Sequence, residues 1–136
     1  MLYLDTSAFL KLVVAEEHSA ALRHVLESEE IWSSTLLDVE AHRAGQRLGI
    51  DAAAIGEYLE IVTLYTLDEG TFARAREVGV STMRTLDALH LAAALELEPE
   101  LDGVVTYDRR LAEGCVAENC RVVAPGHPDG WWTAAT

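Results

Sequence analysis

The chain alternates short apolar runs with stretches of helical spacing along its length. The apolar runs predict five strands, at residues 2–5, 30–33, 61–67, 103–106 and 121–123. The helical stretches, most of which begin at a Ser, Thr or Asp that can cap a helix, lie at residues 6–15, 19–28, 35–48, 51–60, 68–78, 86–97 and 109–118. Strands that are separated by helices pair in parallel. The pattern therefore predicts an α/β fold: a three-layer α/β/α arrangement with a central parallel sheet of about five strands.

The end of the chain departs from this alternation. Residues 125–136 are rich in Pro and Gly and carry Trp131 and Trp132. We interpret this tail as a strap that packs over the domain's own core, with contact to a partner as the alternative. The whole chain, residues 1–136, has a length typical of one domain.

Composition predicts a soluble, cytoplasmic protein without a membrane segment. Half of the residues are hydrophobic, but no apolar run approaches the ~20 residues that a membrane helix needs. The first residues lack the basic start and the cleavage site of a signal peptide. Cys115 and Cys120 are the only cysteines; they lack the spacing of a zinc site and are expected to be reduced thiols.

The formal net charge of the chain is −13. Proteins that bind nucleic acid are usually basic, because phosphate contacts need Lys and Arg. An acidic chain is instead typical of a solubility surface, a cation site or a basic partner. A role in RNA chemistry therefore requires that the few basic residues gather locally.

Three Asp residues stand where an open parallel sheet binds its ligands, at the carboxyl ends of strands. Asp5 ends the first strand, Asp108 follows the fourth with Tyr107 between, and Asp87 lies in the first turn of the apolar helix 86–97. Each of them alone is an ordinary residue for a helix start. However, a charge in a helix as apolar as that of Asp87 needs a partner or a cation.

Glu40 is the fourth acid, inside helix 35–48, and it shares a helical stripe with Arg43 and Arg47. The stripe predicts either a solvated salt-bridge face or a carboxylate flanked by phosphate-binding arginines. Carboxylates that are held together repel one another, and their pKa values rise unless a cation compensates. Because hard oxygen ligands select Mg²⁺ or Mn²⁺, a cluster of the four acids would serve to activate water and to hold a phosphodiester.

Four segments carry these acids: residues 4–8, the helix of Glu40, residues 86–92 and residues 106–111. In order, spacing and surroundings they resemble the four acidic motifs of PIN-domain nucleases, and the compact chain resembles VapC-type toxins in particular. The resemblance covers the chain from its start to the last strand. It implies a central parallel sheet flanked by helices, dependence on Mg²⁺ or Mn²⁺, endoribonuclease activity, a homodimer and a cognate antitoxin.

The resemblance also implies roles for single residues. The main metal ligands would be Asp5, Glu40 and Asp87. Asp108 would complete the site or orient the attacking water, and Thr6 or Thr106 would help through a hydroxyl. Whether one or two metal ions bind stays open. His90, three residues after Asp87, is interpreted as a structural residue packed beside the site, with a catalytic base as the alternative.

Half of the ten Lys and Arg lie within six residues of a motif acid, namely Lys11, Arg43, Arg84, Arg109 and Arg110. A local basic rim can hold phosphates on an acidic protein, and we expect RNA phosphate to be bound by Arg43, Arg84 and Arg109. An antitoxin segment that carries Arg is expected to bind the acids, since guanidinium forms bidentate pairs with carboxylate.

The sequence lacks the residues that two other kinds of acid-bearing α/β domain need. A receiver domain needs a late Lys, and the only Lys here is Lys11. A haloacid-type phosphatase needs DxD after the first strand, where this chain has Asp5-Thr6-Ser7. Two alternatives stay open: a PIN-like RNA-binding or scaffold protein that does not cleave, and a PIN nuclease of RNA processing that works without an antitoxin.

Overall fold

The structure is a computed structural model, and it describes residues 1–133. At its centre lies a five-stranded sheet in the order β3-β2-β1-β4-β5. The strands are β1 (Leu2–Leu4), β2 (Ile31–Ser34), β3 (Thr63–Tyr65), β4 (Gly103–Val105) and β5 (Val122–Val123). All four pairings are parallel. The prediction of an α/β fold around a parallel sheet of about five strands is confirmed.

Helices connect successive strands. They are α1 (Thr6–Val13), α2 (Ser19–Leu26), α3 (Thr35–Leu48), α4 (Ala52–Leu59), α5 (Glu69–Ala75), α6 (Thr85–Leu95) and α7 (Arg109–Ala117), with a short 3-10 helix η1 (Trp131–Thr133). Asp51, Asp68 and Asp108 cap α4, α5 and α7 through their side chains. Gly49, with φ of +72°, ends α3 in the left-handed conformation that glycine adopts without strain.

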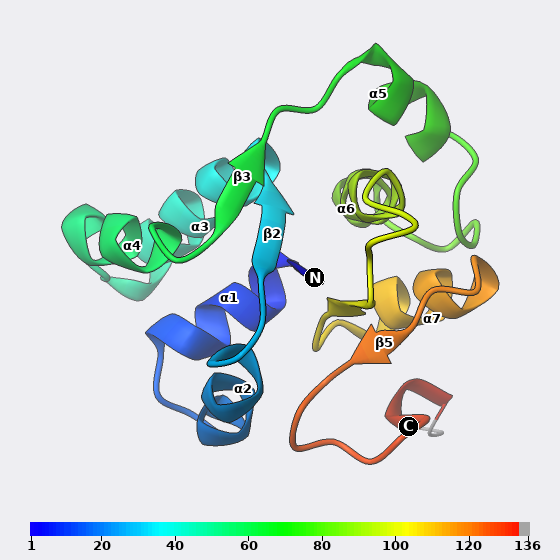
Figure 1. The fold of residues 1–136 in the computed structure, drawn as a ribbon. Coiled ribbons are helices and arrows are strands. Elements are labelled where there is room, and N and C mark those ends of the chain that lie inside the picture. Colours follow the sequence, from blue (N-terminus) through cyan, green and yellow to red (C-terminus); the bar gives the residue numbers. More distant parts are fainter. Residues whose placement is uncertain (134–136) are drawn as a thin grey trace.

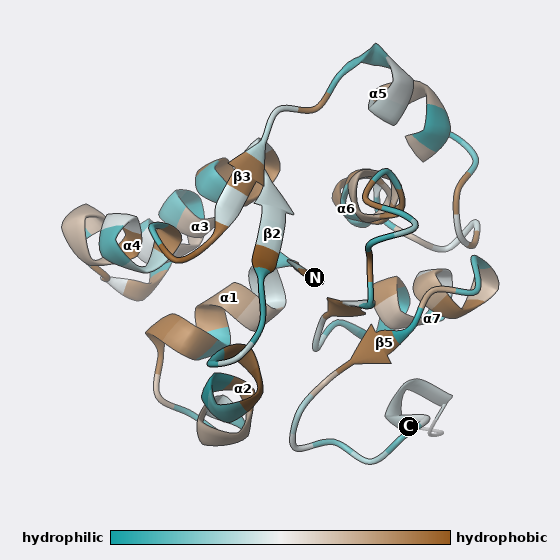
Figure 2. Cartoon of the chain, viewed as in Figure 1, coloured by the Kyte–Doolittle hydropathy of each residue, from teal (hydrophilic) through white to brown (hydrophobic). Residues whose placement is uncertain are grey.

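The two faces of the sheet bury different side chains, because residues alternate along a strand. Leu2 and Leu4 of β1 pack in a cluster with α1, α2, α3 and α4, whereas Tyr3 packs with α6 and α7. Figure 1 shows these two groups of helices on opposite sides of the strands. In Figure 2, hydrophilic stretches lie over α2, α3 and α5, while β5 is hydrophobic. The three layers of the predicted fold are therefore present.

Strand order decides which loops meet. β1 is the middle strand, between β2 and β4, so the carboxyl ends of these three strands open at one edge of the sheet. The backbone N–H of Asp5 continues the ladder by donating to the carbonyl of Val105 (3.2 Å). Residues that follow β1, β2 and β4, together with the start of α6, therefore lie around this edge.

The tail returns along the molecule and packs on it. The hydroxyl of Tyr107 donates to the carbonyl of Pro125 (2.8 Å), and His127 stacks on Trp131 with ring centroids 4.7 Å apart. η1 lies against α7. Up to Thr133 the tail is thus a strap over the domain, and residues 134–136 lie outside the described residues.

Two further features of the described residues concern membrane-spanning helices and cysteines. Within the described residues, none of the helices combines the length and the apolar character needed to cross a bilayer. Cys115 is buried and Cys120 half-buried, and both are free cysteines.

Candidate active site

Asp5 sits at the centre of the carboxyl edge and is only 3% exposed. Its Oδ1 accepts from the backbone N–H of Ala8 (2.9 Å), which makes Asp5 the cap of α1. The Ser7 hydroxyl lies 2.8 and 2.9 Å from its two oxygens, and the Thr106 hydroxyl donates to Oδ2 at 2.6 Å. Burial raises the pKa of Asp5, while these hydrogen bonds act against the rise. The carboxylate is thus fixed from α1 and β4 together.

Glu40 projects from α3 toward a buried hydrogen-bond network. Its Oε1 accepts from the Thr6 hydroxyl (2.9 Å) and from Nε2 of His90 (2.6 Å). The other ring nitrogen of His90 lies 2.8 Å from the Tyr3 hydroxyl, which itself donates to Ser34 at 3.1 Å. His90 therefore donates on both sides, as an imidazolium does.

The charge of His90 follows from its surroundings. Burial alone lowers the pKa of this histidine, but Tyr3 and the hydrogen bond and charge of Glu40 outweigh burial and raise it to about 10. The side chain is 2% exposed. This agrees with the interpretation of His90 as a residue packed and hydrogen-bonded beside the site.

Asp87 lies in the first turn of α6, and it differs from Asp5 and Glu40. Its Oδ2 is buried and has no hydrogen-bond partner within residues 1–133. Burial, followed by the charges of Asp108 and Asp5, raises the pKa of Asp87 to about 6, and His90 and Arg84 only partly oppose this. The sequence predicted that the charge of Asp87 needs a partner, and the side chains around Asp87 do not supply one.

Asp108 caps α7 and closes the edge on the side of β4. Its Oδ1 accepts from the backbone N–H groups of Arg110 (2.9 Å) and Leu111 (3.1 Å). The N–H of Asp108 donates to the Thr106 hydroxyl at 3.0 Å, and that hydroxyl also bonds Asp5. Thr106 therefore links the first and the last of the four acids.

The four acids thus surround one edge but do not form a finished cage. Within residues 1–133, no three His, Cys, Asp or Glu side chains stand close enough together to hold a metal ion as they are oriented. Asp5, Asp87 and Asp108 interact through their charges, and Glu40 joins them through Thr6 and His90. The donor set consists of hard carboxylate oxygens, and the buried Asp87 Oδ2 is unused, which fits a divalent cation such as Mg²⁺ or Mn²⁺.

Comparison with known proteins shows the family of the chain. The family described as PIN domain matches residues 2–116 of this chain. Ribonuclease VapC47 of Mycobacterium tuberculosis (strain CDC 1551 / Oshkosh) is 36% identical over 133 residues, which cover 93% of this chain and 98% of that protein. The chain is a PIN-domain protein of the VapC family. Ribonuclease VapC46 of Mycobacterium tuberculosis (strain ATCC 25618 / H37Rv) is also 36% identical, over 126 residues that cover 91% and 97%.

Solved structures confirm the PIN fold. The crystal structure of Mycobacterium tuberculosis VapC20, described as a Sarcin-Ricin loop cleaving toxin, superposes with a TM-score of 0.72 at 14% identity. The match covers 92% of this chain and all of that one. A toxin–antitoxin complex from Klebsiella pneumoniae gives a TM-score of 0.69 at 16% identity and covers 92% and 98% of the two chains.

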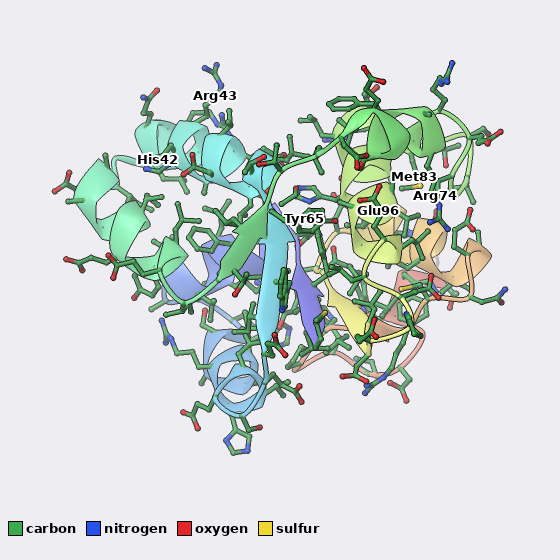
Figure 3. The ribbon with its side chains drawn as sticks, turned by 45° about the horizontal axis from the view of Figure 1, so that its top comes forward. His42, Arg43, Tyr65, Arg74, Met83 and Glu96 are labelled. Carbon is green, nitrogen blue, oxygen red and sulfur yellow. The ribbon has the colours of Figure 1, made fainter. Side chains whose placement is uncertain are left out.

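In this PIN domain two of the three expected phosphate-binding arginines lie together, and Arg43 lies apart from them. Arg84 precedes α6 and Arg109 opens α7, and both line an open pocket of about 520 Å³ that Asp108 also lines. Arg43 is exposed on α3, does not line this pocket, and points outward in Figure 3. The carboxylate of Glu40 turns to Thr6 and His90, so the stripe that it shares with Arg43 is not a salt-bridge face.

Sequence reasoning overlooked three residues of the PIN site. Ser7 bonds both oxygens of Asp5, and Tyr3 and Ser34 hold the far side of His90. A signal existed for Tyr3, because a hydroxyl on the buried face of an apolar strand needs a partner. Nothing comparable marked Ser34, whose role depends on the pairing of β1 with β2.

Proposed function

We propose that this VapC-type protein is an endoribonuclease that hydrolyses RNA phosphodiesters with the aid of Mg²⁺ or Mn²⁺. We propose further that it is the toxin of a type II toxin–antitoxin pair. The observation that carries the proposal is Asp87, a half-buried carboxylate that is destabilised by two other acids and keeps an unpartnered oxygen. Groups held at such a cost are typical of catalytic and cation-binding sites. The identity of 36% to proteins named ribonucleases supports the same activity.

We assign the roles from the PIN resemblance, and the geometry of the acid edge supports them. A divalent cation would be held by Asp5, Glu40 and Asp87, with Asp108 completing the site or orienting the attacking water. When bound, the cation supplies positive charge that lowers the pKa of water and stabilises charge on the phosphate oxygens. Thr106 and Ser7 fix the Asp5 carboxylate, and Thr6 and His90 fix that of Glu40.

The reaction is hydrolysis at phosphorus. The oxygen of a water molecule forms the new bond to phosphorus, the bond from phosphorus to the ribose O3′ breaks, and the leaving oxygen takes up a proton. The products are a 5′-phosphate and a 3′-hydroxyl. Attack by the ribose 2′-OH would instead leave a 2′,3′-cyclic phosphate. The chemical ends of the cleaved RNA therefore distinguish attack by water from attack by the 2′-OH.

The test is cleavage of total RNA by the purified protein in Mn²⁺, in Mg²⁺ and in EDTA, with the cut ends mapped. We expect cleavage that needs the metal, 5′-phosphate ends, and a loss of at least about 100-fold in Asp87→Asn, because even residues that only support metal ligands contribute 10- to 100-fold. Asp129→Asn, at an exposed acid of the tail, is the matched control and should cleave like the parent. Cyclic phosphate ends, or equal cleavage in EDTA, would refute the mechanism.

An antitoxin is the proposed partner, and the Klebsiella pneumoniae neighbour is itself a toxin–antitoxin complex. A segment that carries Arg would place guanidinium against Asp5, Glu40, Asp87 or Asp108, and the charge of −13 would speed its approach at low salt. We expect the product of an adjacent small gene to bind in competition with Mn²⁺. Equal binding to the parent and to an Asp5→Asn/Asp87→Asn variant, without competition by metal, would exclude inhibition through the acids.

The same experiments separate the alternatives. Metal-dependent cleavage without any such partner would indicate a PIN nuclease of RNA processing, and RNA binding without cleavage would indicate a scaffold protein.

We propose a homodimer that acts in the cytoplasm. Sedimentation equilibrium tests the dimer, and a mass of 14.9 kDa, that of one chain, would refute it.

A further inference from the structure

Cys115 and Cys120, the only cysteines of the chain, lie at the two ends of the turn that follows α7. Cys115 belongs to the last turn of the helix, and Cys120 lies two residues before β5. The backbone N–H of Cys120 donates to the carbonyl of Cys115 (2.8 Å), so the chain folds back between them. The bond lengths along this link keep the two Cα atoms less than about 7 Å apart, which is within the span of a disulfide.

The side chains of the two cysteines also share one environment. Cys115 belongs to the hydrophobic cluster of α6 and α7, and Cys120 packs against that cluster. The two thiols hydrogen-bond to each other, which lowers the pKa of Cys120 and raises that of Cys115. Burial and the charge of Glu98 only partly oppose the change at Cys120. The two thiols are therefore direct neighbours in the reduced protein.

The two thiols differ in their access to solvent. Cys115 is fully buried, whereas Cys120 is half-buried. Because the thiolate is the nucleophile, the accessible thiol with the lowered pKa reacts first. A reactive thiol beside a second thiol that can close a disulfide is the arrangement of redox-sensitive cysteine pairs.

We propose that Cys115 and Cys120 are a modification site, which hydrogen peroxide oxidises to a disulfide within the chain. The sulfur of Cys120 forms a bond to one peroxide oxygen, the O–O bond breaks, and the hydroxide that leaves takes up a proton. The sulfur of Cys115 then loses its proton and attacks that of Cys120, and the S–O bond breaks to release water. The peroxide is reduced to water while the two thiols are oxidised, and a dithiol reductant reverses the change by exchange.

The disulfide forms a covalent cross-link at the end of α7 that faces away from the acids. Asp108 caps the opposite end of this nine-residue helix, which is about 13 Å long. At the end near the cysteines, Oε1 of Glu118 accepts from the backbone N–H of Gly79 (2.8 Å), and the chain continues into β5. The cross-link therefore strengthens the attachment of α7, and it does not rest on the proposed nuclease activity.

The test is oxidation of the purified full chain by hydrogen peroxide at pH 7, followed by alkylation of free thiols, digestion with trypsin and mass spectrometry. Cleavage after Arg110 and Arg121 leaves both cysteines in one peptide, residues 111–121, which contains no Met. We expect this peptide to escape alkylation and to weigh about 2 Da less than the dithiol peptide, because two hydrogen atoms are lost. Treatment with dithiothreitol should restore both thiols.

The cross-link has a separate readout in thermal unfolding. The oxidised protein should unfold at a temperature about 5 °C higher than the reduced protein, since a disulfide restricts the unfolded chain. An equal or lower unfolding temperature of the disulfide form would refute the cross-link's effect on α7.

Single variants assign the roles of the two thiols. In Cys120→Ser only the buried thiol remains, and we expect it to stay reduced under the conditions that oxidise the parent. In Cys115→Ser, which keeps a hydrogen-bond donor, Cys120 should stop at the sulfenic acid, which a 1,3-diketone traps as an adduct. Cys115→Ala gives the same readout if the buried position does not accept serine.

Four results would each overturn the modification site, whether or not the protein cuts RNA. They are a parent that keeps both thiols in peroxide, a disulfide that joins two chains, oxidation of Cys120→Ser as fast as that of the parent, and the absence of an adduct in both Cys115 variants. A protein that forms the disulfide but cuts no RNA would keep the site and refute the nuclease.

Discussion

Asp5 and Glu40 form one half of the acid edge, and Asp87 and Asp108 form the other. In the first half, which we call the closed half, both carboxylates accept from several side chains that are themselves held in place. In the second, the open half, Asp108 bonds through Oδ1 to backbone N–H groups, and Asp87 keeps a buried oxygen that no residue within 1–133 satisfies. Asp5 of the closed half follows β1, Asp108 of the open half lies beyond β4, and these two strands pair in parallel.

The difference shows how an acid site is kept both rigid and reactive. A hydrogen-bond network that is satisfied favours one geometry, and the closed half has hydrogen bonds from Asp5 to Thr106 and from Glu40 to His90. In the open half, the negative charge of Asp87 is disfavoured by burial and by the neighbouring acids. Under the proposed function, a cation that entered would relieve the repulsion at Asp87. Variants in the two halves should therefore behave differently.

The largest contrast is expected in stability. Asp5→Ala leaves the Thr106 and Ser7 hydroxyls and the N–H of Ala8 without their acceptor, and should lower the free energy of unfolding by about 2–4 kcal/mol. Asp87→Ala removes a repelled charge and no bond to Oδ2, so it should change that free energy by less than about 1 kcal/mol. Urea denaturation measures both. Equal losses in the two variants would remove the distinction between the halves.

A smaller effect is expected at His90. His90→Ala leaves Glu40 without its buried donor, and should cost about 1–3 kcal/mol and lower cleavage 10- to 100-fold by freeing the carboxylate. His90→Gln, which can still donate to Glu40, should recover part of the cleavage. Tyr3→Phe should cost only about 1 kcal/mol and leave cleavage nearly unchanged.

The pH dependence provides the check for His90. Because the pKa of His90 is raised from 6.5 to about 10, its contribution to stability is present below pH 6.5 and is lost as the pH rises toward 10. The fall in unfolding free energy over this interval should be smaller in His90→Gln than in the parent. Identical pH profiles would show that His90 carries no such charge.

The smallest effect is the pH dependence of Asp87. Its pKa is raised from 3.8 to about 6, so the folded protein holds a proton that the unfolded chain releases between these values. Stability should therefore fall as the pH rises from 4 to 6, by on the order of 1 kcal/mol after screening at this half-exposed group. Asp87→Asn should flatten that interval in denaturant titrations. A parent whose stability rises from pH 4 to 6 as steeply as the variant's would contradict the raised pKa.

The fold could be predicted because its signals are local. Apolar runs, Asp caps and Gly49 are read from neighbouring residues, and strands alternating with helices imply parallel pairing. The positions of Asp5 and Asp108 followed from that fold, since Asp5 comes directly after β1 and Asp108 three residues after the end of β4, and these strands lie side by side. The predicted strand 61–67 was longer than β3 because its flanking residues resemble strand residues but lie outside the ladder.

The contacts of the site could not be predicted in the same way. His90 joins Tyr3 and Glu40, which are 87 and 50 positions away, and their meeting depends on which face each side chain takes. The same holds for Arg84 and Arg110, which share a pocket only because α6 and α7 pack together. Spacing along the chain brought Arg43 close to Glu40, but the turn of α3 directs its side chain outward.

Figure 3 shows a comparable long-range contact away from the site, where Tyr65 of β3 lies toward α6. Its hydroxyl donates to the carbonyl of Ala93, and Thr71 of α5 donates to Glu96 at 2.5 Å. The first bond joins α6, and with it Asp87, to the sheet, and the second joins α5 to the end of α6. The open half is therefore open in its hydrogen bonding while its backbone is held.

The most direct test of the account is calorimetric titration of Mn²⁺ at pH 7.5, where Asp87 is ionised, into the parent, Asp87→Asn and the tail control Asp129→Asn. We predict that Asp87→Asn weakens Mn²⁺ binding at least about 10-fold, because it removes a charged ligand and not merely a supporting residue. Asp129→Asn should bind like the parent. Binding of Mn²⁺ to Asp87→Asn with the affinity of the parent would contradict the claim that Asp87 is a ligand of the cation.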